Sequence, residues 1–322
     1  MEVAPIISEI QGHLERAQRI GIAAHVSPDG DAIGSLLGLG WALRCRGKDP
    51  VLACPTAPLP PSLLFLPGSE DITNSLSGHF DVIVILDSST LDRMDRMYSP
   101  AVFGDALLIN IDHHVTNERY GNINWVDAHS ASTAEMVFAL VEGLGVTPDA
   151  RIATCLLAGI VTDTLGFRTS STTARTLRVA AGLMDAGASL PAIVEEVYNA
   201  KPLGVARIWG EALHDVRAEE GLVWTSITTS MLERHQTNAD EVKGLVSFLR
   251  GTCGTRIAAL FIENGSGKIK VEFRSSAQAD VAQLAAGLGG GGHKQASGCT
   301  VPGPLADAQA RVLAQARRAL TI

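Results

Sequence analysis

The chain has 322 residues, a length that favours two domains. Its composition, 46% hydrophobic and 19% charged, supports sizeable buried cores and excludes a disordered chain. The formal net charge of −8 argues against a protein that binds duplex nucleic acid through its backbone.

The charge is unevenly distributed along the chain. Residues 1–212 carry a net charge of −10, and residues 213–322 carry a net charge of +2. An acidic front part suits cations and a weakly basic rear part suits an anion, although ordinary solvated surface charge produces the same balance.

Five cysteines are scattered along the chain without a CxxC pair. This pattern fits neither a disulfide framework nor a zinc ribbon, and it favours a reducing compartment. The N-terminus shows no basic region followed by an apolar core, and no apolar run is long enough to span a bilayer. We therefore expect a cytoplasmic protein without a membrane partner. The sequence leaves open whether the protein is a monomer or a homodimer.

The first half of the chain alternates short apolar runs with helical patterns. In chain order we expect strands at 20–24, 51–54, 82–86 and 107–111, and helices at 32–46, 133–143, 149–162 and 172–186. The third and fourth strands are continuously apolar, which is typical of parallel strands covered on both faces. Residues 1–188 are therefore predicted to form an α/β domain with a doubly wound, mainly parallel sheet.

The rear half is predicted to be a smaller α/β domain, residues 214–322, joined by a helical linker at 189–213. In chain order we expect a strand at 222–228, a helix at 240–250, and a hairpin of strands 256–262 and 268–273 with its turn at 264–267. Helices at 281–288 and 306–320 follow, with a glycine run between them.

Acidic and histidine residues follow three of the predicted front strands. His25 follows the first strand, Asp87 the third, and the run Asp112-His113-His114 the fourth. The carboxyl ends of parallel strands gather at one edge of a sheet, where the chemistry of such folds is found. Three strand ends with one type of ligand therefore indicate a shared site.

The loop His25-Val-Ser-Pro-Asp29-Gly-Asp31 lies between a strand and a helix. Asp31 alone is explained as a helix cap, and Asp87 alone as a cap of the next loop. Capping does not account for three potential ligands within seven residues. Asp163 ends an otherwise apolar helix, where an unpaired charge is costly and needs a partner.

The donor types narrow the choice of ion. Carboxylate and imidazole groups without thiolate suit Mn²⁺ or Mg²⁺, and also Zn²⁺ and Fe²⁺. Four aspartates and two histidines are more ligands than one tetrahedral ion can bind. They suit two ions that share a bridging carboxylate. Paired ions about 3.5–4 Å apart activate a water and stabilise the attacking and leaving oxygens in phosphoryl transfer. The sequence contains no GxSxG elbow or Cys/His nucleophile motif that would compete with this mechanism.

In this order, the residues resemble the DHH phosphoesterase family: His-x-x-x-Asp-x-Asp, an Asp after a strand, Asp-His-His and a further Asp. The family includes RecJ-like exonucleases, manganese-dependent inorganic pyrophosphatases and small oligoribonuclease/pAp-phosphatase enzymes of the NrnA type. All four motifs are present, as His25/Asp29/Asp31, Asp87, Asp112/His113/His114 and Asp163.

The resemblance implies two Mn²⁺ ions, with Mg²⁺ as the alternative. The ligands of one ion would be His25, Asp29 and Asp87, and those of the other Asp31, Asp87, His113 and Asp163. Asp87 would bridge the ions, and Asp112 would orient the histidines. His114 would contact the scissile phosphate or assist the leaving oxygen. The catalytic residues implied are Asp87, Asp112 and His114.

The glycine-rich segment 289–298 does not match a Walker P-loop. Its N–H groups suit an anionic oxygen, and the nearby Arg274 and Ser275 suit a phosphate, although a glycine run alone favours a flexible turn. Gly-Gly-Gly-His-x-x-Ala-Ser-Gly resembles the DHH-associated C-terminal domain. That resemblance implies a set of substrate-binding residues: His114, Arg274, Ser275, Gly291, Gly292 and His293.

The resemblance implies a Mn²⁺-dependent phosphodiesterase/exonuclease that hydrolyses very short oligonucleotides (nanoRNA), and also 3′-phosphoadenosine 5′-phosphate, by a two-metal-activated water. The glycine motif disfavours a pyrophosphatase, and the compact length disfavours a RecJ-like enzyme. A limited basic surface suits short oligonucleotides or nucleotides, not duplex nucleic acid. A cyclic di-AMP or linear-dinucleotide phosphodiesterase remains an alternative. A nucleotide-sensing module without catalysis is a second alternative, which the complete ligand set disfavours.

Overall fold

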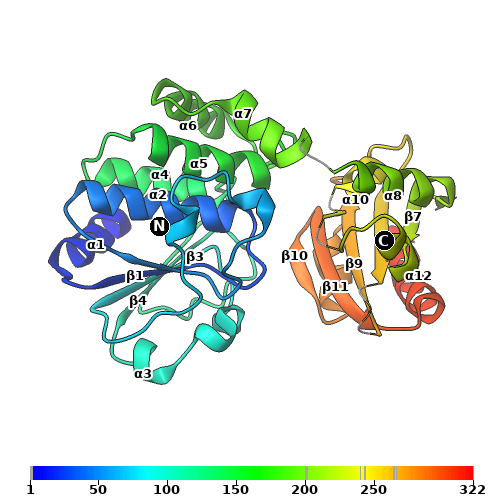
Figure 1. Cartoon of the computed structure of the whole chain (residues 1–322), viewed down its shortest axis with the longest axis horizontal. Coiled ribbons are helices and arrows are strands. Elements are labelled where there is room, and N and C mark those ends of the chain that lie inside the picture. Colours follow the sequence, from blue (N-terminus) through cyan, green and yellow to red (C-terminus); the bar gives the residue numbers. More distant parts are fainter. Residues whose placement is uncertain are drawn as a thin grey trace. The chain divides into compact units, whose positions relative to one another are not determined.

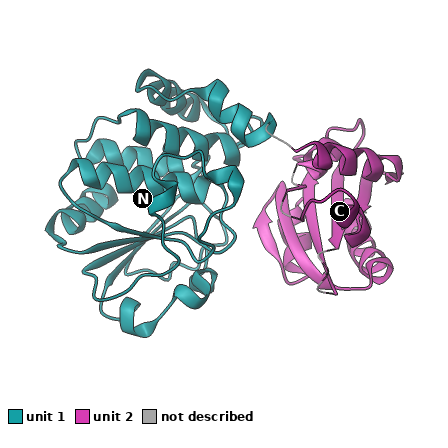
Figure 2. Ribbon diagram, viewed as in Figure 1, with its two compact units in different colours: residues 1–199 teal, residues 200–322 magenta. Residues whose placement is uncertain are grey.

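The computed structural model describes residues 3–199, 202–239, 241–242, 244–263, 265 and 267–321. The chain divides into two compact units, Met1–Asn199 and Ala200–Ile322 (Figure 2). The segment 189–213, predicted as a helical linker, contributes to both units. Helix α7 (Leu190–Val194) and the π-helical turn η4 (Glu195–Asn199) belong to the first unit, where Ile193 enters the core. Helix α8 (Leu203–His214) buries Ile208 in the core of the second.

The first unit contains a sheet of five parallel strands in the order β2-β1-β3-β4-β5. Its strands are β1 (Ile20–Ala23), β2 (Val51–Ala53), β3 (Val82–Leu86), β4 (Leu107–Asp112) and β5 (Ile123–Val126). The predicted parallel α/β sheet is confirmed. Strand β5 was not predicted, because only alternate residues of it are buried and it lacks a continuous apolar run.

Long helices lie on one side of this sheet, and short helices cover the other face (Figure 1). The long helices are α1 (Val3–Arg16), α2 (Gly30–Cys45), α4 (Thr133–Gly143), α5 (Ala150–Asp163) and α6 (Ala174–Asp185). Among them, α5 and α6 are packed outside α2 and α4. On the second face lie η3 (Leu91–Met97) and α3 (Pro100–Phe103), which bury Met94, Met97 and Phe103 against the strands. The turns η1 (Pro61–Leu63) and η2 (Ser69–Asp71) complete the unit.

Helices α2, α4 and α5 pack closely because glycines face their neighbours. A Cβ atom at Gly34 of α2 would lie 2.4 Å from the backbone oxygen of Cys155 in α5. A Cβ atom at Gly159 would lie 2.6 Å from the Cβ of Ala134 in α4 and 2.9 Å from a carboxylate oxygen of Asp31. No larger side chain fits at either position, so these glycines set the spacing of the helices beneath the site.

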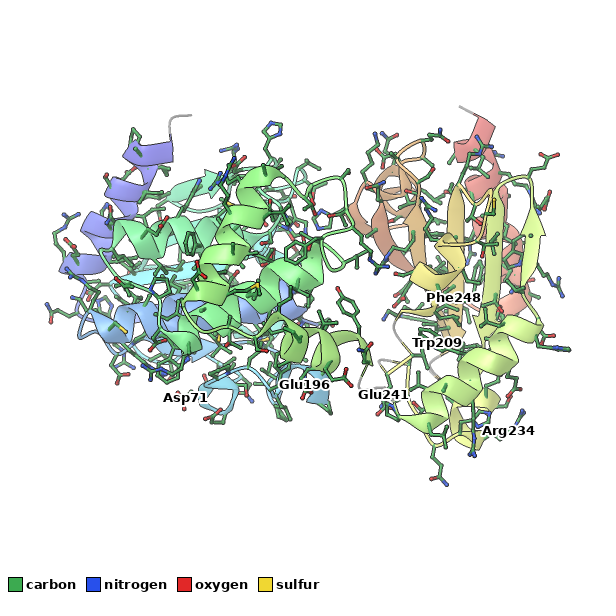
Figure 3. The ribbon with its side chains drawn as sticks, turned by 90° about the horizontal axis from the view of Figure 1, so that it is seen from above. Asp71, Glu196, Trp209, Arg234, Glu241 and Phe248 are labelled. Carbon is green, nitrogen blue, oxygen red and sulfur yellow. The ribbon has the colours of Figure 1, made fainter. Side chains whose placement is uncertain are left out.

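The second unit is a six-stranded sheet in the order β10-β11-β9-β8-β7-β6, in which only β7 and β8 are parallel. Its strands are β6 (Arg217–Glu219), β7 (Leu222–Ile227), β8 (Ile257–Glu263), β9 (Lys268–Ser275), β10 (Gly291–His293) and β11 (Ala296–Pro302). Helices α8, α9 (Thr229–Arg234) and α10 (Leu245–Arg250) cover one face, and Trp209 of α8 lies beside Phe248 of α10 (Figure 3). Helices α11 (Val281–Ala286) and α12 (Leu305–Thr321) cover the other.

Three expectations for the second unit differ from the structure or fall partly outside it. The glycine run ends helix α11 and then forms the edge strand β10, since Gly291 pairs with Gly298 of β11. The helix predicted at 240–250 begins at Leu245, and residues 240 and 243 lie outside the described residues. Residues 264 and 266 of the predicted hairpin turn also lie outside them.

Within the described part of the chain, no single helix has the length and apolarity to cross a membrane. One bent pair, α6 with the helical segment 190–199, meets the criteria jointly on length and composition alone.

Candidate metal centre and active site

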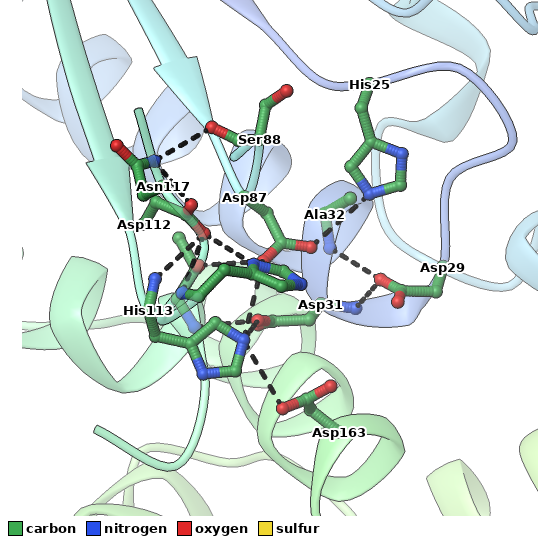
Figure 4. A network of polar contacts seen from close by, with 12 residues as sticks. His25, Asp29, Asp31, Ala32, Asp87, Ser88, Asp112, His113, Asn117 and Asp163 are labelled. Carbon is green, nitrogen blue, oxygen red and sulfur yellow. Dashed lines mark hydrogen bonds and ion pairs between the residues drawn. The ribbon is translucent and has the colours of Figure 1, made fainter. Parts of the chain in front are cut away.

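The predicted site residues of the first unit meet at the carboxyl edge of its sheet (Figure 4). They arrive from five segments: the loop after β1, the start of α2, the end of β3, the end of β4 and the last residue of α5. The residues brought together are His25, Asp29, Asp31, Asp87, Asp112, His113, His114 and Asp163. The order reverses between β1 and β3, a topological switch point where open parallel sheets bind their ligands.

One cluster comprises His25, Asp29 and Asp87, whose ligand atoms all lie within 4.8 Å of one another. Nε2 of His25 is 3.5 Å from Oδ2 of Asp87. Asp29 is the N-cap of α2, and its Oδ1 accepts the N–H groups of Asp31 and Ala32, both at 3.0 Å. Capping, which we considered for Asp31, is therefore the role of Asp29, whose second oxygen can bind a cation.

A second cluster surrounds His113. Its Nε2 lies 3.5 Å from Oδ2 of Asp163, 3.6 Å from Oδ1 of Asp87 and 3.8 Å from Oδ2 of Asp31. These separations exceed normal hydrogen bonds and suit donors that share a cation about 2.0–2.2 Å from each. Asp87 offers Oδ2 to the first cluster and Oδ1 to the second, as a bridging carboxylate would.

Local backbone geometry aims these carboxylates. Asp87 adopts a left-handed conformation with φ of 57°, which aspartate tolerates better than most residues. Its Oδ1 accepts the hydroxyl of Thr133 at 2.9 Å. The carboxylate of Asp31 accepts the N–H groups of Thr133 at 2.7 Å and Ala134 at 2.9 Å, at the N-terminus of α4. The partial positive charge of that helix end therefore holds Asp31 in place.

Burial perturbs the titration of the cluster. Burial raises the pKa of Asp31 well above its usual value, and the neighbouring Asp87 raises it further. Burial also raises the pKa of Asp163, to about 7. For His113 burial opposes the charged form, but the charges of Asp163, Asp87 and Asp31 outweigh it and raise the pKa to about 9. The carboxylates need positive charge among them, which protons or cations can supply.

Asp112 and His114 form a hydrogen-bonded pair beside the clusters. Nδ1 of His114 lies 2.7 Å from Oδ1 of Asp112, which also accepts the backbone N–H groups of His113 and His114. Burial alone would raise the pKa of Asp112, but the hydrogen bond from His114 outweighs burial and lowers that pKa. The Asp112 carboxyl therefore stays ionised. The contact at Nδ1 fixes the orientation of the His114 ring.

Asn117 holds Asp112 from its other side and was not among the predicted site residues. Nδ2 of Asn117 donates to Oδ2 of Asp112 at 2.6 Å and also lies within hydrogen-bond distance of Ser88 and Asn110. The hydroxyl of Tyr120 donates to the same Ser88 carbonyl. Asn117 follows His114 by three residues in a polar loop, and this nearness along the chain was the only available signal.

The predicted substrate residues of the second unit lie on β9 and β10. Arg274 and Ser275 end β9, but the hydroxyl of Ser275 is engaged with the carbonyls of Ala279 and Lys294 and is 5% exposed. Gly292 has a φ of 135°, and a Cβ there would lie 2.7 Å from the oxygen of Ala296. That position therefore requires glycine.

Other glycines of the run are committed to structure. The N–H groups of Gly289 and Gly290 donate to carbonyls of Ala286 and Ala285 in α11. These two N–H groups are therefore not available to the anionic oxygen that the glycine run was expected to bind. Gly291 and His293 remain on the edge strand β10.

Comparison with known proteins identifies both units. Residues 19–160 match the DHH family, N-terminal domain, and residues 225–321 match the DHHA1 domain. A bifunctional oligoribonuclease and PAP phosphatase NrnA from Thermus thermophilus is 35% identical, over 99% of this chain and 94% of its own. The Bacillus subtilis protein of the same name is 32% identical, over 86% of this chain and 87% of its own.

Solved structures resemble this chain as well. An exopolyphosphatase-related protein from Bacteroides fragilis superposes with a TM-score of 0.88 at 28% identity, covering 99% of this chain and 96% of its own. RecJ from Thermus thermophilus, solved with Mn²⁺, shares the fold at 17% identity with a TM-score of 0.57, covering 98% of this chain and 55% of its own. The carboxylates and histidines of the cluster lie close enough together to hold a divalent metal ion, in line with the metal binding that this family implies. The chain belongs to the DHH phosphoesterase family, in the branch with a DHHA1 domain, and is a phosphoric ester hydrolase.

Proposed function

We propose that the protein is a Mn²⁺-dependent oligoribonuclease and nucleotide phosphatase. It would hydrolyse very short oligonucleotides and 3′-phosphoadenosine 5′-phosphate. The observation that carries this proposal is the similarity, over nearly the whole length of both chains, to a relative named for these two activities. The first unit would hold the metals and the second, with Arg274, Gly291, Gly292 and His293, would bind the substrate.

The donor set fits two cations. We assign His25, Asp29 and Asp87 to one ion, and Asp31, Asp87, His113 and Asp163 to the other, in agreement with the two clusters around Asp87. When bound, a pair of divalent cations activates water and neutralises charge on the phosphoryl oxygens. Mn²⁺ is proposed over Mg²⁺ because imidazole ligands suit it better.

The chain's own residues supply the remaining chemistry. Asp112 holds Nδ1 of His114, so Nε2 is directed away from the carboxylate toward the substrate. Burial opposes protonation of His114, but the hydrogen bond and charge of Asp112, with the charge of Asp87, raise its pKa above the usual value. His114 can therefore donate a proton or a hydrogen bond to the phosphate or to the leaving oxygen at neutral pH.

A substrate panel with the purified protein tests the proposal. It should contain a ribodinucleotide, a 24-nucleotide RNA, 3′-phosphoadenosine 5′-phosphate, cyclic di-AMP and its linear dinucleotide product, each with Mn²⁺ and with Mg²⁺. The proposal requires the highest kcat/KM on the dinucleotides, measurable release of phosphate from 3′-phosphoadenosine 5′-phosphate, and a large loss on the long RNA. Equal turnover of the long RNA would contradict it.

A cyclic-dinucleotide phosphodiesterase is the second candidate. A cyclic-di-AMP phosphodiesterase PdeA from Listeria monocytogenes is 26% identical over 58% of this chain, but the match covers only 31% of that protein. Preferential cleavage of cyclic di-AMP in the panel would favour this activity. A sensing module without catalysis is disfavoured, because the complete ligand set meets at the site.

Metal affinity is expected to increase with pH between 7 and 9. His113, with a pKa raised to about 9 by neighbouring carboxylates, and Asp163, with a pKa raised to about 7 by burial, must lose protons to bind an ion. Each displaced proton contributes up to about tenfold in apparent affinity per pH unit. Calorimetric titration of Mn²⁺ in two buffers of different ionisation enthalpy measures the protons released.

The same shifts have a defined sign for stability without metal. The raised pKa of His113 stabilises the fold fully below about pH 6.5, and that stabilisation is lost as the pH increases through about 9. Chelator-treated protein should therefore melt at a lower temperature at pH 9 than at pH 6.5. Saturating Mn²⁺ should reduce this difference in melting temperature. In the binding experiment described above, a Mn²⁺ affinity that does not change with pH would contradict the ligand assignment.

A further inference from the structure

Arg93 lies against the metal-binding loop from the second face of the sheet. It belongs to η3, and its backbone oxygen accepts the N–H of Val26 at 2.9 Å, which ties η3 to the loop after β1. Its side chain is half-buried, and Nη2 lies 2.8 Å from Nδ1 of His25. A permanently charged group is thus held one imidazole ring away from the carboxylate cluster.

No carboxylate neutralises this guanidinium. Several other arginines of the first unit form ion pairs, as Arg44 does with Asp71 and Arg151 with Asp149. Among the residues the structure describes, none offers Arg93 a carboxylate oxygen within 4 Å, and its one side-chain hydrogen bond is to His25. A half-buried arginine without an acidic partner is available to an anionic ligand.

The hydrogen bond to His25 is incompatible with a metal-binding imidazole. Nδ1 of His25 is also 2.8 Å from the carbonyl oxygen of Val26. A neutral ring that binds a cation through Nε2 carries its hydrogen on Nδ1, so Nδ1 donates to Val26 and cannot accept from Arg93. With the ion in place, the guanidinium therefore has no acceptor in the described protein.

We propose that Arg93 is a substrate-binding residue that takes an oxygen of the reacting phosphate group beside the ion assigned to His25. The ligand class is a phosphate ester or the phosphate it yields. This inference rests on the proposed function and extends it to a residue outside the family motifs given above. Arg93 lies six residues after Asp87 in a charged stretch, where nothing in the sequence distinguishes it from Arg96.

The test compares Arg93→Gln and Arg93→Lys with Arg96→Gln as the matched control. Arg96 lies in the same 3-10 segment and is exposed. Glutamine at position 93 keeps a polar side chain that can donate hydrogen bonds, but it removes the positive charge and the forked guanidinium donor. Three quantities are measured for each variant: the Kd of Mn²⁺, the Kd of inorganic phosphate and of 5′-AMP for the Mn²⁺-loaded protein, and kcat and KM on a ribodinucleotide.

Arg93→Gln should weaken phosphate and 5′-AMP binding by about 10–100-fold, the loss of a charge-assisted hydrogen bond, and raise KM to a similar extent. Its Mn²⁺ affinity should be little changed, because the carbonyl oxygen of Val26 remains the partner of Nδ1 of His25. The phosphate affinity of Arg93→Lys should lie between those of wild type and Arg93→Gln, and Arg96→Gln should match wild type.

Two results would overturn the assignment. If Arg93→Gln loses Mn²⁺ affinity while phosphate binding at saturating Mn²⁺ is normal, Arg93 only positions His25. If both affinities are unchanged, the residue has no role in binding. Failure of the proposed function is a different result: the wild-type protein would then cleave none of the panel substrates, or would cleave the long RNA as fast as the dinucleotides, whatever the phosphate affinities of the variants.

Discussion

The variant Asp87→Asn should lose hydrolysis and divalent-metal binding together while remaining folded. Among the described residues, Asp87 belongs to each group of possible metal ligands that contains a carboxylate, and its two oxygens face His25 and His113. Asparagine tolerates the left-handed backbone at this position and can still accept the hydroxyl of Thr133. The substitution removes the negative charge that the two cations would share.

The expected loss in kcat/KM is at least about 10³-fold, because bound metal contributes several kcal/mol of transition-state stabilisation and each 1.36 kcal/mol is tenfold. Mn²⁺ binding is measured by calorimetry, and the melting temperature is measured without metal. Asp92→Asn is the control, since Asp92 is exposed in the neighbouring η3. Normal turnover by Asp87→Asn would refute the two-metal assignment. Asp87→Ala is a weaker test, because it also strains the backbone.

Gly34→Ala is expected to destabilise the first unit. The added methyl group would lie 2.4 Å from a backbone oxygen of α5, so the two helices must separate. Overpacking of this kind costs about 1–3 kcal/mol, and contact with backbone rather than a flexible side chain places the cost at the upper end. For a unit of this size the melting temperature should fall by about 6–12 °C.

The same substitution should reduce activity, because α2 carries Asp31 and α5 carries Asp163. A displacement of about 1 Å between catalytic groups costs on the order of 10²-fold in rate. Gly182→Ala in α6 is the matched control: a Cβ there meets nothing within 4 Å, and removing a helical glycine should stabilise by up to about 1 kcal/mol. Equal melting temperatures for the two variants would show that close helix packing does not depend on Gly34.

The sequence predicted the front sheet well because its strands are buried on both faces. The predicted limits of 82–86 agree with β3, and those of the other three predicted strands agree to within one residue. The same burial made the polar residues at their ends conspicuous. The half-exposed strand β5 gave no such contrast, and the edge strand β10 is composed largely of glycine, whose signal is that of a turn.

The site could be predicted where chemistry depends on residue type and not where it depends on proximity alone. Aspartates and histidines at strand ends are distinctive, but Asn117 and Arg93 act through contacts of 2.6 and 2.8 Å that only folding reveals. Capping of α2 was considered for Asp31, but the residue that caps the helix is Asp29. Asp31 instead contacts the N-terminus of α4, about 100 positions away along the chain, and no local pattern encodes that contact.

The amide groups that hold Asp31 belong to the backbone of α4, so the carboxylate is oriented before any ion arrives. An incoming cation has to shed water and displace protons, but it does not have to reorganise the chain. On the metal assignment proposed above, a cation that binds Asp31 therefore loses hydration water without requiring that carboxylate to turn.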